Sequence, residues 1–329
     1  MRFAILGCGS IGRRHARNLV TLGERDLIIY DRYAPAGEAL ASELGVRSCT
    51  VLDEVWSRDP EVAFVTAPTS DHIELALTAA RNGCHLFVEK PLSHSREGVE
   101  ALAAEVGLRG LVAMVACNMR FHPGPARIKR LVETNGLGQI LAAKLHAGSH
   151  LPGWRPGTNY RDSYSASASR GGGAVLDCIH EIDLALWYFG PGRVVGAATR
   201  PAASIGLDVE GIAEMLLIHG SGVVSNIHLN FVQRDYRRTC QIVGAEASLY
   251  WDFENPYIQI CRGDGHPPEV EMLPGEWATN DMYVDELRYF LCCIREGRGS
   301  LNDIGAARET LEVALHAKEL GGMDPAGSS

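Results

Sequence analysis

Apolar residues in the first 120 positions form short runs that alternate with longer segments of helical periodicity. Runs rich in Val, Ile, Leu and Phe predict strands that are buried on both faces. We expect strands at Phe3–Leu6, Leu27–Tyr30, Val62–Thr66, His85–Val88 and Leu111–Val115. Between them, helices are predicted at Ile11–Leu22, Ala36–Leu44, Asp71–Asn82 and Ser95–Val106. This alternation predicts a doubly wound parallel sheet with helices on both faces.

The pattern changes from about Gly138 onward. Segments such as Val223–Phe231 and Arg237–Val243 alternate apolar and polar residues, which is typical of half-buried antiparallel strands. Two amphipathic helices are predicted near the end, at Tyr283–Arg295 and Ala306–Leu320. The second half is therefore predicted to be an α+β domain with a large, mostly antiparallel open sheet.

Two prolines bracket a glycine at His122-Pro123-Gly124-Pro125, and a helical pattern restarts just beyond them. A length of 329 residues and a hydrophobic content of 46% suit about two domains. We therefore expect one domain over residues 1–122 and a second over residues 123–329.

Charge and apolar runs exclude two classes of partner. The chain has 31 basic and 40 acidic residues, a formal charge of −9, which opposes the electrostatic attraction on which nucleic-acid binding relies. No apolar run approaches membrane-spanning length, and the sequence enters its first strand directly after Met1. We expect no nucleic-acid partner, no membrane segment, no signal peptide and a cytoplasmic location.

The nine cysteines include the adjacent pair Cys292-Cys293 but no CxxC or Cys/His metal spacing. An odd number of cysteines in a cytosolic protein indicates free thiols. The sequence therefore predicts neither a disulfide nor a metal site. The small and turn-forming residues after Leu320 predict a frayed tail.

A glycine-rich turn joins the first strand to the first helix. Its members are Gly7, Gly9, Ser10, Ile11 and Gly12. In this position the first glycine permits a tight turn, the second lets the backbone approach a pyrophosphate, and the third allows close helix-to-strand packing. The turn is typical of a Rossmann dinucleotide-binding domain.

An acidic residue, Asp31, closes the second strand, 19 residues after Gly12. Its carboxylate can accept hydrogen bonds from both ribose hydroxyls of NAD and would repel the extra phosphate of NADP. The adjacent Arg32 could accommodate that phosphate. We therefore predict NAD as the cofactor, with NADP left open.

The tripeptide Glu89-Lys90-Pro91 follows the strand His85–Val88, at the edge where doubly wound sheets bind ligands. A lysine in this position is either a solvated surface charge or a functional cation. The adjacent proline favours the second interpretation, because a cis X-Pro bond would fix the direction of the lysine.

A triple glycine, residues 171–173, precedes a predicted helix that carries Asp177, His180 and Asp183. In a helix these three side chains would lie near one stripe. A histidine beside carboxylates suits proton transfer, because it titrates near neutrality. The alternative makes Asp177 a helix cap, His180 a buried core residue and Asp183 a surface charge.

The segment from residue 151 to 164 is aromatic, basic and rich in turn formers. It could bind a sugar by ring stacking and hold a carboxylate or phosphate through arginine, or it could form a loop at an oligomer interface. The candidate substrate residues here are Trp154, Arg155, Tyr160, Arg161 and Tyr164.

Taken together, these motifs resemble the Gfo/Idh/MocA family of sugar and inositol oxidoreductases along nearly the whole chain. The segments that carry the resemblance are Gly7–Gly12, Glu89–Pro91, Asn118–Pro123, Gly171–Asp183 and Glu246–Asp252. The spacing of three residues between Asp177 and His180 resembles a subgroup with an Asp-x-x-His-Glu-x-Asp helix, which is associated with bacterial surface-sugar pathways.

The resemblance implies roles for individual residues. Lys90 would bind and polarise the reacting hydroxyl, Glu89 would lie near the nicotinamide ribose, and His180 would accept the proton with help from Asp177. A second cofactor loop and further residues that border the crevice are implied at Thr66, Pro68 and His72, and at Asn118, Arg120 and Gln233.

The sequence therefore predicts an NAD-dependent dehydrogenase that acts on a secondary hydroxyl of a sugar, a sugar derivative or a cyclitol. By resemblance it would be a homodimer or homotetramer that uses the exposed face of its second sheet. Two alternatives stay open: redox-neutral NAD-dependent glycoside cleavage or epimerisation, and a non-catalytic NAD sensor or scaffold.

Overall fold

The computed structural model describes residues 1–263 and 265–322. By its internal contacts the chain divides into two compact units. The first unit contains Met1–Asn118 and Thr279–Leu311, and the second contains Met119–Ala278 and the chain from Glu312 onward. The last seven positions of the predicted frayed tail lie outside the described residues.

The first unit is built on a six-stranded sheet, and every strand pair in it is parallel. Its strands are β1 (Phe3–Leu6), β2 (Leu27–Tyr30), β3 (Arg47–Cys49), β4 (Val62–Val65), β5 (His85–Val88) and β6 (Ala113–Val115). The strand order β3-β2-β1-β4-β5-β6 reverses direction between β1 and β4. Ligands of such sheets bind at this reversal, outside the carboxyl ends of the strands. The predicted Rossmann sheet is confirmed.

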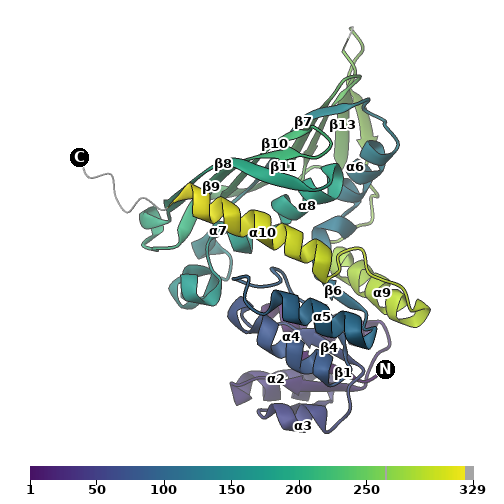
Figure 1. The fold of residues 1–329 in the computed structure, drawn as a ribbon, viewed down its shortest axis with the longest axis vertical. Helices are drawn as coiled ribbons and strands as arrows, with labels where there is room; N and C mark the ends of the chain where they lie inside the picture. The colour runs from purple at the N-terminus through teal and green to yellow at the C-terminus, as the bar shows by residue number, and fades with distance from the viewer. Residues whose placement is uncertain (264, 323–329) are drawn as a thin grey trace. The chain divides into compact units, whose positions relative to one another are not determined.

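Helices α1 (Ser10–Thr21), α2 (Ala34–Leu44), α3 (Leu52–Trp56), α4 (His72–Arg81), α5 (Val99–Arg109) and α9 (Asp281–Glu296) belong to this unit. In Figure 1, α4 and α5 lie side by side. Our predictions omitted β3 and α3, which are three and five residues long. They also began α5 at Ser95, whereas Gly98 adopts a left-handed conformation with a φ of 73° and so cannot belong to the helix.

Helix α9 completes the core of the first unit, although it comes late in the chain. Its Phe290 contacts Phe64 of β4 and Phe87 of β5, with ring centroids 6.2 and 5.3 Å apart. All three rings are fully buried. The apolar face of this helix therefore covers the strands at the centre of the parallel sheet.

The second unit contains an eight-stranded sheet in the order β14-β13-β12-β11-β7-β10-β9-β8. Its strands are β7 (Ile140–His150), β8 (Gly192–Pro201), β9 (Glu210–His219), β10 (Val224–Asn230), β11 (Val232–Gly244), β12 (Ser248–Asp252), β13 (Tyr257–Cys261) and β14 (Glu269–Met272). Only β7 and β10 pair in parallel among these described strands. The predicted mostly antiparallel sheet is confirmed.

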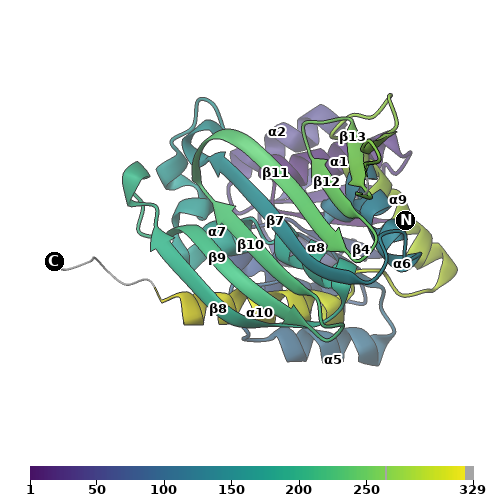
Figure 2. The same ribbon diagram turned by 90° about the horizontal axis from the view of Figure 1, so that it is seen from above.

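Helices cover one face of this sheet. Helix α8 (His180–Phe189) contacts β7, β10 and α6 (Pro123–Glu133), while the four-residue α7 (Ala174–Asp177) contacts β9 and β10. Figure 2 shows the strands in front and α8 behind them. The opposite face exposes apolar side chains, because alternate residues of each strand point away from the helices. They include Val195, Leu216, Ile218, Val224 and Tyr250.

The last helix, α10 (Ile304–Gly321), begins in the first unit and ends in the second. Within the described residues no helix is both long and apolar enough to cross a membrane. The nine cysteines are all free thiols, and no three His, Cys, Asp or Glu side chains in the described chain are grouped so as to hold a metal ion.

Candidate active site

The loops that follow β1 and β4 meet at the carboxyl edge of the parallel sheet. Gly7 has a φ of 110°, and a Cβ there would lie 2.6 Å from the amide nitrogen of Ala67. A Cβ on Gly12 would clash with the carbonyl oxygen of Gly7. The Thr66 hydroxyl donates a hydrogen bond of 2.7 Å to the same oxygen. Gly7 and Gly12 are therefore required by close backbone packing.

Gly9 has a different environment, because nothing lies within 4 Å of the position that its Cβ would occupy. It is the N-cap of α1, and no side chain of the described residues caps the helix. The first backbone N–H groups of a helix, here from Ser10 and Ile11, attract anionic groups. Open space beside uncapped N–H groups fits the pyrophosphate of a dinucleotide.

Asp31 holds the neighbouring backbone by hydrogen bonds. One carboxylate oxygen accepts from the amide of Cys8 at 2.7 Å, and the other accepts from the amide of Tyr33 at 2.8 Å. The exposed Arg32 reaches across to Asp71, 3.3 Å away. Asp31 is thus fixed beside the glycine-rich turn.

The Cys8 thiol is unreactive, because burial raises its pKa to about 12.

His72 links the loops that follow β4 and β5. Its Nδ1 lies 2.9 Å from the carbonyl oxygen of Pro91, and its Nε2 lies 2.9 Å from that of Ala67. Burial lowers the pKa of this imidazole, although its contacts with the two carbonyl oxygens oppose the shift. Pro68, the N-cap of a short 3₁₀ turn, lies in the same loop as Ala67. His72 therefore fixes the separation of the two loops.

Glu89 and Lys90 follow β5 directly. The backbone N–H of Glu89 donates to Val65 and so extends the parallel ladder by one residue. Its carboxylate accepts a hydrogen bond of 3.1 Å from the Lys90 amide. The peptide bond between Lys90 and Pro91 is cis. Lys90 therefore lies at the predicted edge of the sheet. The backbone N–H groups of Glu89 and Lys90 are both hydrogen-bonded, to Val65 and to the Glu89 carboxylate.

In the second unit, the predicted continuous helix through Asp177 and Asp183 is interrupted. Helix α7 ends at Asp177, and α8 begins at His180. Cys178, between them, has a φ of −96° and a ψ of 33°, outside the helical region. The prediction of one helical stripe for Asp177, His180 and Asp183 was wrong, because the stripe requires an unbroken helix.

Asp183 and Arg120, both predicted to bind substrate, bind each other. The guanidinium Nε and Nη2 donate to the two carboxylate oxygens at 2.8 and 2.7 Å. Both side chains are almost fully buried, at 5% and 1% exposure. Trp187 packs 5.4 Å from the same guanidinium. This two-pronged ion pair joins the 3₁₀ turn at Asn118–Phe121 to α8.

Asp177 contacts the segment of residues 151–164, here called the aromatic loop. It accepts a hydrogen bond of 3.0 Å from the hydroxyl of Tyr164, and the guanidinium of Arg155 lies 5.6 Å from the centre of the Tyr164 ring. Trp154 donates to Ser149 and packs edge-on against Phe231. Four of the predicted site residues thus belong to one region of the second unit: Trp154, Arg155, Tyr164 and Asp177.

Tyr160 and Arg161 anchor that loop to another part of the unit. The Tyr160 hydroxyl donates to the carbonyl oxygen of Ile205 at 2.8 Å. The Arg161 guanidinium lies over the Tyr160 ring, with 5.0 Å between its carbon and the ring centre, and also packs against Gly206. These two residues therefore stabilise the conformation of the loop.

The glycine-rich turn and the sheet order agree with a family comparison. The model for an oxidoreductase family with an NAD-binding Rossmann fold, Gfo/Idh/MocA, matches residues 1–117. The model for the C-terminal domain of the same family matches residues 126–250. The chain belongs to the Gfo/Idh/MocA family. It is therefore an NAD(P)-dependent oxidoreductase, which agrees with the fit of its glycine-rich turn to a dinucleotide.

Curated relatives align along nearly the whole chain. The scyllo-inositol 2-dehydrogenase (NAD(+)) of Bacillus subtilis strain 168 is 27% identical, over 96% of this chain and 93% of its own. The UDP-N-acetylglucosamine 3-dehydrogenase of Acidithiobacillus ferrooxidans is also 27% identical, over 97% and 96%. A solved levoglucosan dehydrogenase in complex with NADH has a TM-score of 0.88 at 20% identity, over 98% and 96%, and shows the shared fold.

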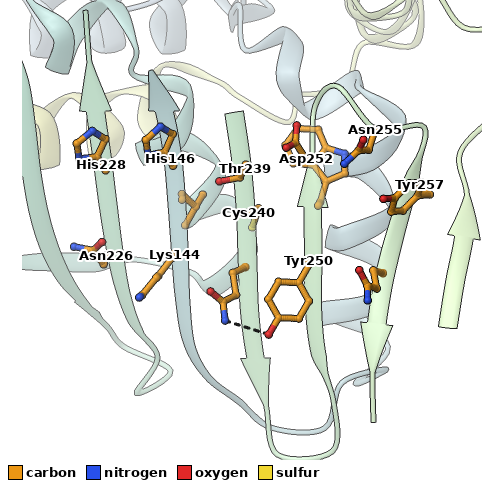
Figure 3. Close-up of a pocket in the computed structure, with 14 residues that line it drawn as sticks. Lys144, His146, Asn226, His228, Thr239, Cys240, Tyr250, Asp252, Asn255 and Tyr257 are labelled. Carbon is orange, nitrogen blue, oxygen red and sulfur yellow. Dashed lines mark hydrogen bonds between the residues drawn. The ribbon is translucent and has the colours of Figure 1, made fainter. Parts of the chain in front are cut away.

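One residue that the family resemblance suggested lies elsewhere in the second unit. The amide oxygen of Gln233 accepts a hydrogen bond of 2.9 Å from the Nε2 atom of His146 and one of 3.2 Å from the amide of Asn230. His146 stacks on His228, and both line a cavity of about 390 Å³ on the open face of the sheet (Figure 3). The structure therefore places Gln233 beside these two histidines.

Asn118, the last residue before the second unit, is buried, and its amide oxygen accepts no hydrogen bond from any described residue.

Two further side-chain pairs in this Gfo/Idh/MocA chain were not predicted from the sequence. His15 of α1 lies 2.7 Å from Glu89, and Arg238 of β11 forms an ion pair at 2.8 Å with the buried Glu181 of α8. His15 lies one helical turn after Gly12, but nothing local in the sequence indicates its distant partner.

We expect the replacement Arg120→Met to lower the free energy of unfolding by about 3 to 5 kcal/mol, because it leaves the buried Asp183 carboxylate without its guanidinium. The double replacement Arg120→Met/Asp183→Leu should recover most of that loss. Urea denaturation measures both changes. The control Arg17→Met breaks an exposed pair with Glu43 and should cost about 1 kcal/mol or less. Equal losses for Arg120→Met and Arg17→Met would contradict the assignment.

Proposed function

We propose that this protein oxidises a secondary hydroxyl of a sugar, a sugar derivative or a cyclitol and transfers the hydride to NAD. The observation that carries the proposal is the position of Lys90 at the carboxyl end of β5. This is the sheet edge that also carries the dinucleotide-binding turn after β1. An ammonium group at that edge suits a reaction beside a bound nicotinamide.

The names of the relatives support this class of substrate. They are dehydrogenases of scyllo-inositol, of UDP-N-acetylglucosamine and of levoglucosan. The names give three different substrates, a cyclitol and two sugar derivatives, but one kind of reaction. Membership of the family therefore indicates the reaction and not the individual substrate. We infer the same reaction for this chain and leave the particular sugar or cyclitol to a substrate panel.

The proposed chemistry divides between the cofactor and the protein. Bound NAD supplies the hydride acceptor. The Lys90 ammonium stabilises the negative charge that develops on the substrate oxygen, and the His180 imidazole accepts the hydroxyl proton. Asp177, held by Tyr164, assists the histidine. Glu89 stays close to the nicotinamide ribose.

We propose distinct roles for the remaining predicted substrate residues. Trp154 and Arg155 contact the substrate by stacking and by charge, while Tyr160 and Arg161 hold the loop that carries them. Arg120 and Asp183 position α8, since each neutralises the other. Asn118 supplies a hydrogen-bond acceptor to the substrate, because its buried amide oxygen has no hydrogen-bond partner among the described residues.

We expect Lys90→Ala and His180→Ala each to abolish most turnover and to leave NAD binding largely intact, because each removes one group that acts on the substrate hydroxyl. The measurement is NADH formation with a panel of sugars, uronates, sugar nucleotides and inositols. The exposed residues Arg25 and His316 provide matched controls, as Arg25→Ala and His316→Ala. Unchanged turnover in both site variants would refute the assignment. Net NADH accumulation also separates a dehydrogenase from a redox-neutral enzyme.

We propose that Asp31 makes NAD the preferred cofactor over NADP. Its carboxylate is held in place by two backbone amides, so it cannot swing away from a 2′-phosphate. Arg32 is 63% exposed and only loosely paired with Asp71, which leaves its guanidinium within reach of such a phosphate once the opposing carboxylate is removed.

We expect Asp31→Asn to lower the preference for NAD over NADP, expressed as a ratio of kcat/KM values, by about tenfold or more, because like-charge repulsion is lost. The double variant Asp31→Asn/Arg32→Ala should gain less activity with NADP. Thermal melting of the cofactor-free variants shows whether the lost hydrogen bond has altered the fold. An unchanged ratio in a stable Asp31→Asn variant would show that the carboxylate does not select the cofactor.

We also propose that the open face of the eight-stranded sheet forms the contact between copies of the chain. Several apolar side chains are exposed there, which is unusual for a surface that stays in water. The cavity with His146 and His228 lies on the same face (Figure 3). The resulting homodimer or homotetramer, and the cytoplasmic location, remain predictions.

Leu216→Asp should reduce the assembly to monomers, because it introduces a charge among the exposed apolar side chains of β8, β9 and β10. Light scattering at micromolar concentration measures the particle mass. Leu108, which is 82% exposed on α5, provides the control, and Leu108→Asp should leave the mass unchanged. A monomeric native protein, or a Leu216→Asp variant of native mass, would argue against this contact.

A further inference from the structure

We propose that His15 is a positioning residue that holds the Glu89 carboxylate and, through it, the backbone that carries Lys90. The inference rests on the function proposed above for Lys90. It extends the site from the loop after β5 back to α1.

His15 and Glu89 form a buried pair inside the first unit. The imidazole Nε2 lies 2.7 Å from the Oε1 atom of Glu89, and the two side chains are 0% and 10% exposed. Aromatic rings surround the imidazole: the centroids of Phe87, Phe64 and Tyr283 lie 5.0, 6.0 and 6.1 Å from its own. The imidazole therefore has little freedom to rotate.

The direction of the hydrogen bond follows from the chemistry of the two groups. An ionised carboxylate only accepts, so Nε2 carries the hydrogen and donates it. Burial alone would raise the pKa of Glu89, but the hydrogen bond from His15 and the neighbouring positive charges outweigh it, so this pKa lies below its ordinary value. The Nδ1 atom has no hydrogen-bond partner among the described residues, so the imidazole is held to Glu89 through Nε2 alone.

The second oxygen of Glu89 carries the constraint to the lysine. It accepts the hydrogen bond from the Lys90 amide, while the Glu89 amide is fixed to Val65 of β4. On the far side of Lys90, the Pro91 carbonyl is held by His72. Both sides of the lysine are thus bound to the body of the first unit. In this proposal, His15 keeps the Glu89 side chain in position by binding its other oxygen, Oε1.

A purely structural role for His15 predicts a different result from a positioning role. If the ring only fills space among Phe87, Phe64 and Tyr283, an aromatic replacement should be harmless and a flexible amide should be damaging. If the hydrogen bond matters, the order reverses. Two replacements therefore separate the roles: His15→Phe keeps the ring and loses the donor, and His15→Gln loses the ring and keeps an N–H donor.

With the complete protein and an active substrate from the panel, we expect His15→Phe to lower kcat about 10- to 100-fold, as for the loss of a hydrogen bond to a charged group. The KM for NAD and the melting temperature should change little. His15→Gln should retain clearly more of the native kcat than His15→Phe. A native kcat in His15→Phe, with a lower one in His15→Gln, would overturn the proposal.

A second measurement does not depend on turnover. Nitrogen-15 NMR of the imidazoles in the cofactor-free protein should show His15 with its hydrogen on Nε2, and Glu89→Leu should shift this signal while leaving His316 unchanged. A hydrogen on Nδ1 would overturn the proposal. If the native protein oxidises no member of the panel, the proposed function fails, but the NMR result still decides whether His15 holds Glu89.

Discussion

The candidate site depends on the meeting of three loops at the carboxyl edge of the parallel sheet. Backbone atoms of the loops after β1 and β4 approach so closely that Gly7 has no room for a Cβ. The His72 ring then spans the second and third loops, with its two nitrogens 2.9 Å from the carbonyl oxygens of Ala67 and Pro91. The dinucleotide-binding turn and Lys90 are therefore parts of one hydrogen-bonded edge and not independent motifs.

The same close packing explains two members of the triple glycine of the second unit, Gly172 and Gly173. A Cβ on Gly172 would clash with the backbone of the aromatic loop at Tyr164, and one on Gly173 would clash with the Glu210 carboxylate. Glu210 is itself bound by Lys318 of α10 at 2.9 Å. The glycines let the loop and β9 approach the start of α7, which brings the Tyr164 hydroxyl to Asp177.

Much of this could be predicted from the sequence, because the strongest signals are local. Continuous apolar runs identify buried parallel strands, and the glycine-rich turn with Asp31 identifies the cofactor loop. The interruption between α7 and α8 could not be predicted, since Asp177 to Asp183 has an unbroken helical pattern. Nor could the pairs formed by His15 with Glu89 and by Arg120 with Asp183. Their members are 74 and 63 positions apart, and only the folded chain brings them together.

The chain passes between its two units after Asn118, after Ala278 and after Leu311. A gene fragment that stopped before residue 279 would encode all six parallel strands but not α9, whose Phe290 covers Phe64 and Phe87. The first unit is therefore not encoded by one continuous segment of the gene. Replacing everything from residue 119 onward in one piece would remove α9 and uncover Phe64 and Phe87 of the first unit.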